Sequence, residues 1–448
     1  MNFTVNVTLS PRQAATCHVR QHFRFRTAAT LLIMLVALPT FATTNDTQEN
    51  NLEALVAMAL QQHPAILAER AMGNAAQEDL HAAQLQRYPS LSMQSDTSGT
   101  SPSVISARYT VWDGGRTEAG IRAARSNTLV RGAQMQEIEQ QLALRVIDAW
   151  QGLQQAHGRM QVIAATQQKY SQFFALMQRR VKALVSPAIE LELVAARNSQ
   201  ITVEMVQAEG AARAAQNRLN VLLGQAYAAD YLLGPLNQQE QVARIETDLA
   251  RTGSPLAAEA VDHLPSVIKA RFQAQVAKEQ ANAERAGRLP EAYVVLQKQI
   301  GNANTLNPQT KSVFFGLQYA PGAGFSSSAR SRSADSRAES AAQGVDQAER
   351  DARDTMQQEI VELGNSRGRI IALEQSFTST QLIMESYQRQ FVASRRSWQE
   401  VLNAARENHD VGINLADTRA SVVGSAYRLR VRMNDPFWQS SLKKKASQ

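Results

Sequence analysis

The feature that most restricts the fold of this chain is the segment from Gly115 to Leu184, which contains no proline. As a single helix its roughly 70 residues would extend about 105 Å, whereas helices in globular proteins average about 10–14 residues. Aromatic residues make up only 6% of the chain, while good helix formers such as Ala, Gln and Arg are abundant. This composition is poor in the residues of a β-rich core. We therefore predict a mainly α chain.

Apolar residues along this segment recur in alternating steps of four and three, a spacing typical of helices packed as a coiled coil. The predicted seam consists of Ala149, Leu153, Ala156, Met160, Ile163, Gln167, Tyr170, Phe174, Met177, Val181 and Leu184. In the second half of the chain a seven-residue recurrence joins Leu363, Ile370, Phe377, Met384 and Phe391. Both patterns predict long helices that pack against neighbours and keep a polar face.

The chain also contains an internal repeat. Four pairs of segments match in the same order, and they are 52–64 with 256–265, 88–89 with 289–290, 192–196 with 400–404, and 218–221 with 428–431. Matches that keep their order and nearly constant separation indicate duplication. We therefore predict two homologous halves, each with the order helix, two short strands, very long helix, break and further helix.

These signals predict five regions. They are a signal peptide over 1–42, a first repeat over 43–224, a linker over 225–253, a second repeat over 254–434 and a tail over 435–448. The first repeat is expected to hold strands at about 90–112 and a helical hairpin over 115–224. The second repeat is expected to hold strands at about 291–320 and a hairpin over 323–433.

The predicted signal peptide has three recognisable parts. Arginines precede an apolar run over 29–38, and Thr40-Phe41-Ala42 places small residues at both cleavage positions. The alternative is a buried N-terminal helix. Removal of residues 1–42 lowers the net charge from +7 to +3, which weakens the case for nucleic-acid binding made by the pI near 9.6. Cys17 is the single cysteine, so a disulfide framework and a multi-cysteine metal cluster are excluded. Because Cys17 precedes the apolar run, we expect no lipid anchor at the cleavage site.

Alternating side chains predict the strands. Ile105, Ala107, Tyr109 and Val111 alternate with polar residues, and a second strand is predicted through Val313, Phe315, Leu317 and Tyr319. The segment Ala292–Gln299 is the expected partner strand, and Asn302–Pro308 is the expected turn. The alternative is an edge hairpin on a soluble helical domain. Because the smallest transmembrane barrels have about eight strands, four strands per chain imply a barrel shared by several copies.

The order of elements and several motifs resemble the TolC family of Gram-negative outer membrane channel proteins. The motifs that carry the resemblance are Leu52–Leu55 with His63-Pro64, Tyr88-Pro89, Val111–Gly115, Leu219–Gly224 and Ser397–Ala404. The resemblance covers roughly residues 51–434. It implies a homotrimer in the outer membrane, with a twelve-stranded β-barrel in lipid and a long periplasmic α-helical barrel. It also implies two partners, a periplasmic adaptor (membrane fusion) protein and an energised inner membrane transporter.

Within that family, Ser397–Ala404 and the uninterrupted Arg406-Glu407 are most similar to members that serve type I secretion. That branch implies an inner membrane ABC transporter and a large secreted adhesin as cargo. The missing lipid-anchor cysteine agrees with it, because many drug-efflux members are lipoproteins. The alternative function is an efflux duct for drugs or metal ions.

The resemblance also implies a periplasmic gate at the two helix-to-helix turns, Val185–Glu192 and Ala393–Asn403. Glu192 and Glu400 match acidic residues of these turns, and Arg396 matches an arginine that pairs across the entrance. Asn403 stands where the family often has a second aspartate. Three copies would bring these carboxylates into a ring of negative potential. The alternative is that they are solvated residues at helix ends.

No arrangement in the sequence predicts an enzyme, a cofactor or a metal site. The histidines, among them His63 and His409, are scattered without the spacing of metal ligands, and Gly322–Phe325 lacks the strand–helix pattern of a phosphate-binding loop. His63 precedes Pro64 at a helix break and is expected to be structural. A soluble coiled-coil adaptor or scaffold is the remaining alternative.

Overall fold

The computed structural model describes residues 52–95, 103–233, 260–300 and 311–433. All of them lie in one compact unit, Glu49–Gln448. The predicted signal peptide, the turn Asn302–Pro308, the tail and most of the linker lie outside the described residues. None of the helices in these ranges combines the length and the apolar character needed to cross a membrane.

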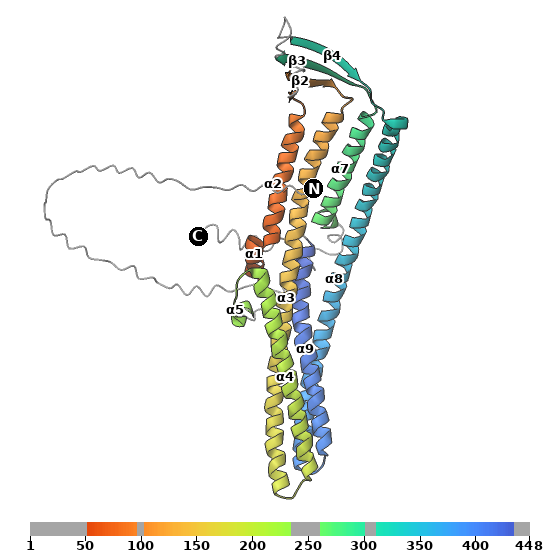
Figure 1. Ribbon diagram of the computed structural model, residues 1–448. Coiled ribbons are helices and arrows are strands. Elements are labelled where there is room, and N and C mark those ends of the chain that lie inside the picture. The colour runs from red at the N-terminus through yellow and green to blue at the C-terminus, as the bar shows by residue number, and fades with distance from the viewer. Residues whose placement is uncertain (1–51, 96–102, 234–259, 301–310, 434–448) are drawn as a thin grey trace, which may run out of the picture. The chain divides into compact units, whose positions relative to one another are not determined.

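The same order of elements occurs twice (Figure 1). The first set is α1 (Leu52–Gln62), α2 (Pro64–Leu85), β1 (Ser90–Gln94), β2 (Ser103–Trp112), α3 (Arg116–Lys182) and α4 (Ala188–Leu223), followed by the short α5 (Ala229–Leu233). The second set is α7 (Pro265–Ala286), β3 (Glu291–Ile300), β4 (Lys311–Gln318), a 3₁₀ turn η1 (Ala323–Phe325), α8 (Ser326–Val392) and α9 (Trp398–Arg432). Both α2 and α7 have 22 residues, and both α3 and α8 have 67. The predicted mainly α fold with a duplicated order of elements is confirmed.

Prolines bound the equivalent helices α2 and α7. Pro64 and Pro265 occupy the first helical position of α2 and α7, where the missing N–H has no helical partner to lose. Pro89 and Pro290 follow the ends of these helices, because the residue before a proline is pushed out of the helical region. His63 caps α2, since its Nδ1 accepts a hydrogen bond of 3.2 Å from the Ala65 N–H. Its expected structural role is thereby accounted for.

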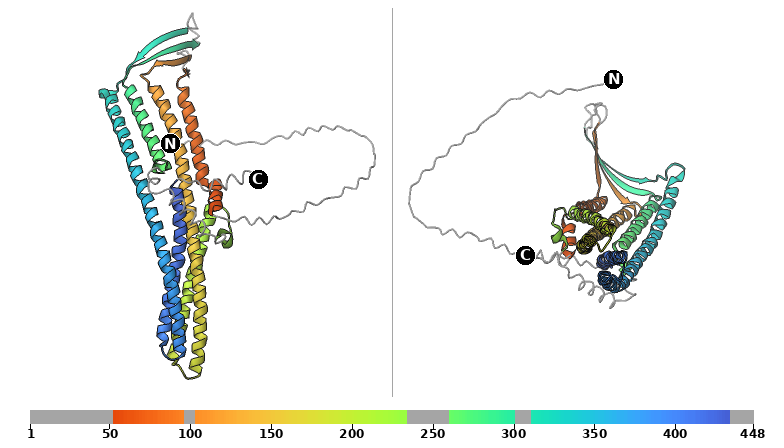
Figure 2. Two further views of the ribbon diagram at one scale, coloured as in Figure 1. Left: turned by 180° about the vertical axis from the view of Figure 1, so that it is seen from behind. Right: turned by 90° about the horizontal axis from the view of Figure 1, so that it is seen from below.

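The strands form one antiparallel sheet in the order β1-β2-β3-β4. Figure 2 shows this sheet at the ends of α2, α3, α7 and α8. Opposite pairs such as Ile105 with Lys298 and Val294 with Phe315 fix the register, and a bulge separates Thr110 from Trp112. The predicted strand segments are therefore present, although Tyr319 lies one residue beyond β4.

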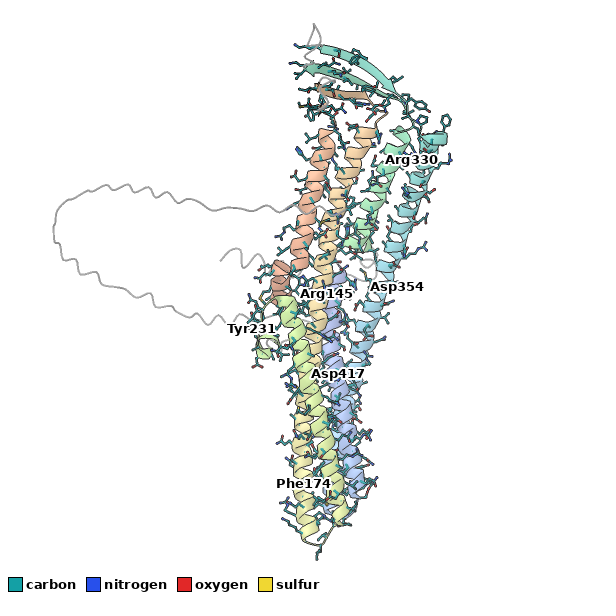
Figure 3. All side chains as sticks on the ribbon, viewed as in Figure 1. Arg145, Phe174, Tyr231, Arg330, Asp354 and Asp417 are labelled. Atoms are coloured by element: carbon teal, nitrogen blue, oxygen red, sulfur yellow. The ribbon has the colours of Figure 1, made fainter. Side chains whose placement is uncertain are left out.

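Helix packing changes along α3. Near the sheet α3 packs between α2 and α7, and farther along it packs against α4 and α9, while α8 packs against α7 and α9. Most of the predicted seam faces these neighbours, because Leu153, Ile163 and Met177 are buried. Charged residues such as Arg330 and Asp354 lie exposed along α8 (Figure 3).

The seam prediction is wrong at its end. Leu184 is 93% exposed, because it lies beyond the last residue of α3 and has a left-handed backbone (φ 58°). Phe174 is half-buried (Figure 3), and its neighbour Phe173 takes the core position instead. In α8 the seven-residue pattern holds better, since Met384 and Phe391 are buried.

Candidate functional site

The two turns that join α3 to α4 and α8 to α9 have the same backbone geometry. Leu184 and Ser394 are both left-handed, with φ of 58° and 57°. Two residues in matching positions close the turns: the Val185 N–H donates to the Arg180 carbonyl and the Arg395 N–H donates to the Gln390 carbonyl, both at 2.9 Å. Such 6→1 hydrogen bonds after a left-handed residue end many helices. The two turns are therefore structural equivalents, one from each repeat.

This equivalence corrects the pairing of acidic residues between the repeats. The turns match at a separation of 210 positions, as the helix starts Ala188 and Trp398 show. The counterpart of Glu400 is then Glu190, which lies in the first turn of α4 as Glu400 lies in the first turn of α9. The sequence match of Glu192 with Glu400 is displaced by two residues, because it aligned the similar residues of 192–196 and 400–404 and not the starts of the two helices.

Glu400 and Arg396 are brought together within the second turn. Ser397 and Glu400 form a capping box, in which Glu400 Oε2 accepts hydrogen bonds of 2.9 Å from the Ser397 N–H and hydroxyl. Arg396 Nη1 donates to Glu400 Oε1, and its guanidinium lies 4.5 Å from the centre of the Tyr387 ring. The Ser397 backbone N–H and then the Arg396 hydrogen bond hold the pKa of Glu400 below its usual value. Glu400 is therefore an ionised, doubly held carboxylate.

The other two predicted site residues stand apart from this pair. Glu192 on α4 and Asn403 on α9 are exposed. Among the described residues Glu192 has no ion-pair partner, and the amide of Asn403 carries no charge. Glu190 cannot accept the hydrogen bond that Glu400 accepts from the backbone N–H at the N-cap, because the N-cap residue of α4 is Pro187, which has no N–H to donate. The Oε2 atom of Glu190 is buried and lacks a hydrogen-bond partner among the described residues.

An aromatic cluster lies directly behind the second turn. Trp398, the first residue of α9, is 2% exposed. Its ring packs edge-to-face on that of Phe173, with 5.5 Å between ring centroids, and the centroid of the Phe391 ring lies 4.8 Å away. The guanidinium of Arg180 lies 4.7 Å from the centre of the Phe391 ring. Phe173 belongs to the first repeat and Trp398 to the second, so this cluster joins the two hairpins. Sequence reasoning missed it, although the heptad position of Phe391 was a usable signal.

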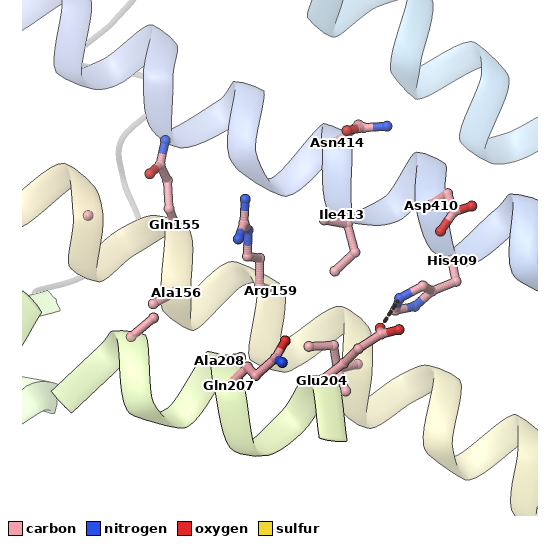
Figure 4. A pocket seen from close by; sticks show the side chains of 13 residues that line it. Gln155, Ala156, Arg159, Glu204, Gln207, Ala208, His409, Asp410, Ile413 and Asn414 are labelled. Carbon is pink, nitrogen blue, oxygen red and sulfur yellow. Dashed lines mark hydrogen bonds and ion pairs between the residues drawn. The ribbon is translucent and has the colours of Figure 1, made fainter. Parts of the chain in front are cut away.

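Polar contacts join the same hairpins farther from the turns. A pocket of about 680 Å³ lies between α3, α4 and α9, and Figure 4 shows His409 and Glu204 pointing toward each other in it. His409 Nε2 lies 2.9 Å from Glu204 Oε2, and His409 Nδ1 lies 3.0 Å from the hydroxyl of Thr166. Arg159 and Asp417 form a bidentate ion pair, in which Nε and Nη2 of Arg159 donate hydrogen bonds of 2.7 and 2.6 Å to the two carboxylate oxygens of Asp417. These contacts tie α9 of the second repeat to both helices of the first hairpin.

Comparison with known proteins identifies relatives of this architecture. Residues 55–225 match the model of the family described as outer membrane efflux protein. The outer membrane protein VceC of Vibrio cholerae has a TM-score of 0.74 at 15% identity, over 86% of this chain and 96% of VceC. The CmeC outer membrane channel of Campylobacter jejuni has a TM-score of 0.71 at 12% identity, over 88% of this chain and 89% of CmeC. No curated protein matches the sequence.

A third solved structure agrees with these two. The outer-membrane channel OprN has a TM-score of 0.73 at 15% identity, over 86% of this chain and 90% of OprN. At such low identities the likeness establishes the shared fold rather than the cargo or the partners.

Proposed function

We propose that this chain, whose residues 55–225 match the model of the outer membrane efflux protein family and whose fold is similar to that of solved outer membrane channels, is the outer membrane factor of a multi-protein export system. The chain lies in the outer membrane, and its long helices extend into the periplasm. Three copies form the duct, and a periplasmic adaptor protein joins it to an inner membrane transporter. Such a duct conducts its cargo passively and needs no catalytic residues.

The observation that carries this proposal is the amphipathic sheet. One face of the four strands consists mainly of apolar side chains, several of which are highly exposed, including Leu91 (77%) and Phe315 (84%). Exposed apolar faces of this extent are costly in water and mark a lipid or protein contact. Four strands are too few to enclose a pore, and twelve strands from three copies exceed the minimum of about eight.

The proposed cargo route is type I secretion, in which an ABC transporter drives a large adhesin protein through the duct. The segment Ser397–Ala404 and the adjacent Arg406-Glu407 support this branch by their resemblance to its members. The second candidate is a duct for drug or metal efflux. The description of the matching family as efflux proteins favours that candidate.

Partner identification distinguishes the two candidates. Cells that express an affinity-tagged form of the chain are cross-linked, and the inner membrane protein that copurifies is identified by mass spectrometry. We expect an ABC transporter, together with loss of a large surface protein when the chain is deleted. Recovery of a proton-driven pump, with raised sensitivity of the deletion strain to drugs or metals, would replace this assignment with efflux.

We further propose that the two turns form the periplasmic entrance, with Glu192, Arg396, Glu400 and Asn403 at or near its narrowest point. Arg396 and Glu400 support this role, because their ion pair stabilises the turn and their charges lie at its surface. Threefold repetition around an axis would concentrate the negative charge of Glu400, Glu192 and the nearby Glu190.

A further inference from the structure

Two lysines stand directly opposite each other on the apolar face of the sheet. Lys298 of β3 and Lys311 of β4 are cross-strand partners, and both side chains are exposed. Cβ atoms of such partners are about 4.5–5.5 Å apart, so like charges in these positions destabilise a sheet. In the described part of the chain neither ammonium group has an ion-pair partner. The connecting segment 301–310 contains no Asp or Glu in its sequence.

The register places both lysines on the apolar side, because side chains of a strand alternate between the two faces of a sheet. The residues that share this side are Leu91, Met93, Ser103, Ile105, Ala107, Tyr109, Trp112, Ala292, Val294, Leu296, Ile300, Val313, Phe315 and Leu317, of which only Ser103 is polar. On the opposite side the one described cation is paired, since Arg108 Nη2 lies 3.1 Å from Glu291 Oε1. Among the described residues of the sheet, the cations without a counter-ion are therefore the two lysines on the apolar side.

The lysines also lie near one end of the apolar surface, where only the Ser103–Ile300 pair lies beyond them in the described strands. Trp112 lies opposite Ala292 at the end that leads into the helices, and Lys298 lies six residues along β3 from Ala292. That separation is about 20 Å in a strand. Tryptophan is enriched at membrane–water interfaces, so Trp112 would mark one interface, and lysines near the far end of a lipid-facing surface extend their ammonium groups to the other interface.

We propose that Lys298 and Lys311 together bind the phosphate group of an anionic lipid at the outer rim of the membrane-embedded sheet. This proposal rests on the proposed function, because it requires the apolar face to contact lipid. A phosphate between the two ammonium groups would replace their repulsion with two charge-assisted hydrogen bonds. The acyl chains of the bound lipid would lie along the neighbouring apolar side chains, of which Leu296 and Val313 flank the lysine pair.

Retention of lipid by the reconstituted protein tests this site. Wild type and the double variant Lys298→Gln/Lys311→Gln are reconstituted in vesicles with equal amounts of phosphatidylcholine and phosphatidylglycerol, and are then gently solubilised. The ratio of anionic to neutral lipid that copurifies is measured by mass spectrometry. A basic residue near a membrane surface contributes a factor of about 5 to anionic-lipid binding, so we expect the enrichment to fall by up to roughly 25-fold in the double variant.

Two further variants make the result specific. Lys298→Arg/Lys311→Arg keeps both charges and should keep the enrichment, and Lys182→Gln removes a charge at the far end of α3 and should leave it unchanged. Equal enrichment in wild type and the Gln variant would overturn the site. Displacement of the anionic lipid by millimolar inorganic phosphate would also overturn it, because the lysines would then bind a free anion. A wild-type protein that fails to enter vesicles or to conduct ions would refute the proposed function itself, whereas a conducting Gln variant shows that only the lipid site is lost.

Discussion

Asp113 fixes the joint between the sheet and the first long helix. Its carboxylate accepts hydrogen bonds from the Gly115 N–H at 2.9 Å, the Thr117 N–H at 2.7 Å and the Thr117 hydroxyl at 2.5 Å. Gly114 and Gly115 have φ of 67° and 87°, which side chains rarely tolerate, and a Cβ on Gly114 would lie 2.7 Å from Leu289 Cδ1. The motif Asp113-Gly114-Gly115 is therefore explained by the sharp turn from β2 into α3.

Asp113→Asn should destabilise the protein at neutral pH and lose that effect in acid. Partial burial raises the pKa of Asp113, but the hydrogen bonds of Thr117 and of neighbouring backbone N–H groups lower it more, so the pKa lies below its usual value. A lowered folded-state pKa stabilises the fold above the unfolded value of about 3.9, and that stabilisation is lost as the pH falls through the folded value. We expect a loss of about 1–2 kcal/mol at pH 7.

Thermal unfolding of both proteins from pH 7 to pH 3 measures this difference. The gap between wild type and Asp113→Asn should narrow below about pH 4, where the unfolded carboxyl group takes up its proton. A gap that stays constant down to pH 3 would show that the Asp113 carboxylate does not contribute through its charge.

Arg396→Ala should enlarge the single-channel conductance in planar bilayers. The substitution removes the ion pair with Glu400 and the contact with Tyr387, both of which hold the second turn. The matched control is Arg389→Ala, because Arg389 lies in the last turn of α8 outside this pair. Conductance of Arg396→Ala equal to that of wild type would contradict the gate assignment.

Helix α8 carries an exposed apolar stripe that the described part of the chain leaves uncovered. Ile360, Ile371 and Leu382 recur every eleven residues, so they lie on one side of the helix, and Ile371 is 71% exposed. The other sides of α8 contact α7 and α9 of the same chain. We expect this stripe to face the neighbouring copy in the proposed trimer.

Ile371→Asp should therefore dissociate the oligomer. An uncompensated charge buried in an interface costs roughly 3 kcal/mol or more, which corresponds to at least about 100-fold weaker association at each interface. Asn365→Asp is the control, since it adds the same charge at an exposed position about a third of a turn away from the stripe. Mass photometry in detergent distinguishes the species, and an intact Ile371→Asp oligomer would place the interface elsewhere.

At the scale of the whole molecule, the sequence predicts the long elements well. Periodic apolar positions and prolines locate α2, α3, α7 and α8, because these signals depend on neighbours along one helix. Contacts between the repeats could not be predicted in this way, since Thr166 and His409 are 243 residues apart and Phe173 and Trp398 belong to different hairpins. No local pattern encodes such pairs.

The candidate site shows the same limit. The Arg396–Glu400 pair is local and could be found in the sequence, because residues four apart share a helix face. The equivalence of Glu190 and Glu400 required the helix starts, which a sequence match displaced by two residues could not supply. Small shifts within a turn move a side chain to another face, so residue-level roles at turns need the structure.

Conversion of a four-stranded chain into a closed pore by association of three copies is the central claim. Native mass spectrometry of the detergent-purified protein, combined with conductance recordings from the same preparation in planar bilayers, tests it most directly. We expect a species of three chains that conducts ions. A monomer as the sole species, or a preparation that forms no conducting pores, would contradict it.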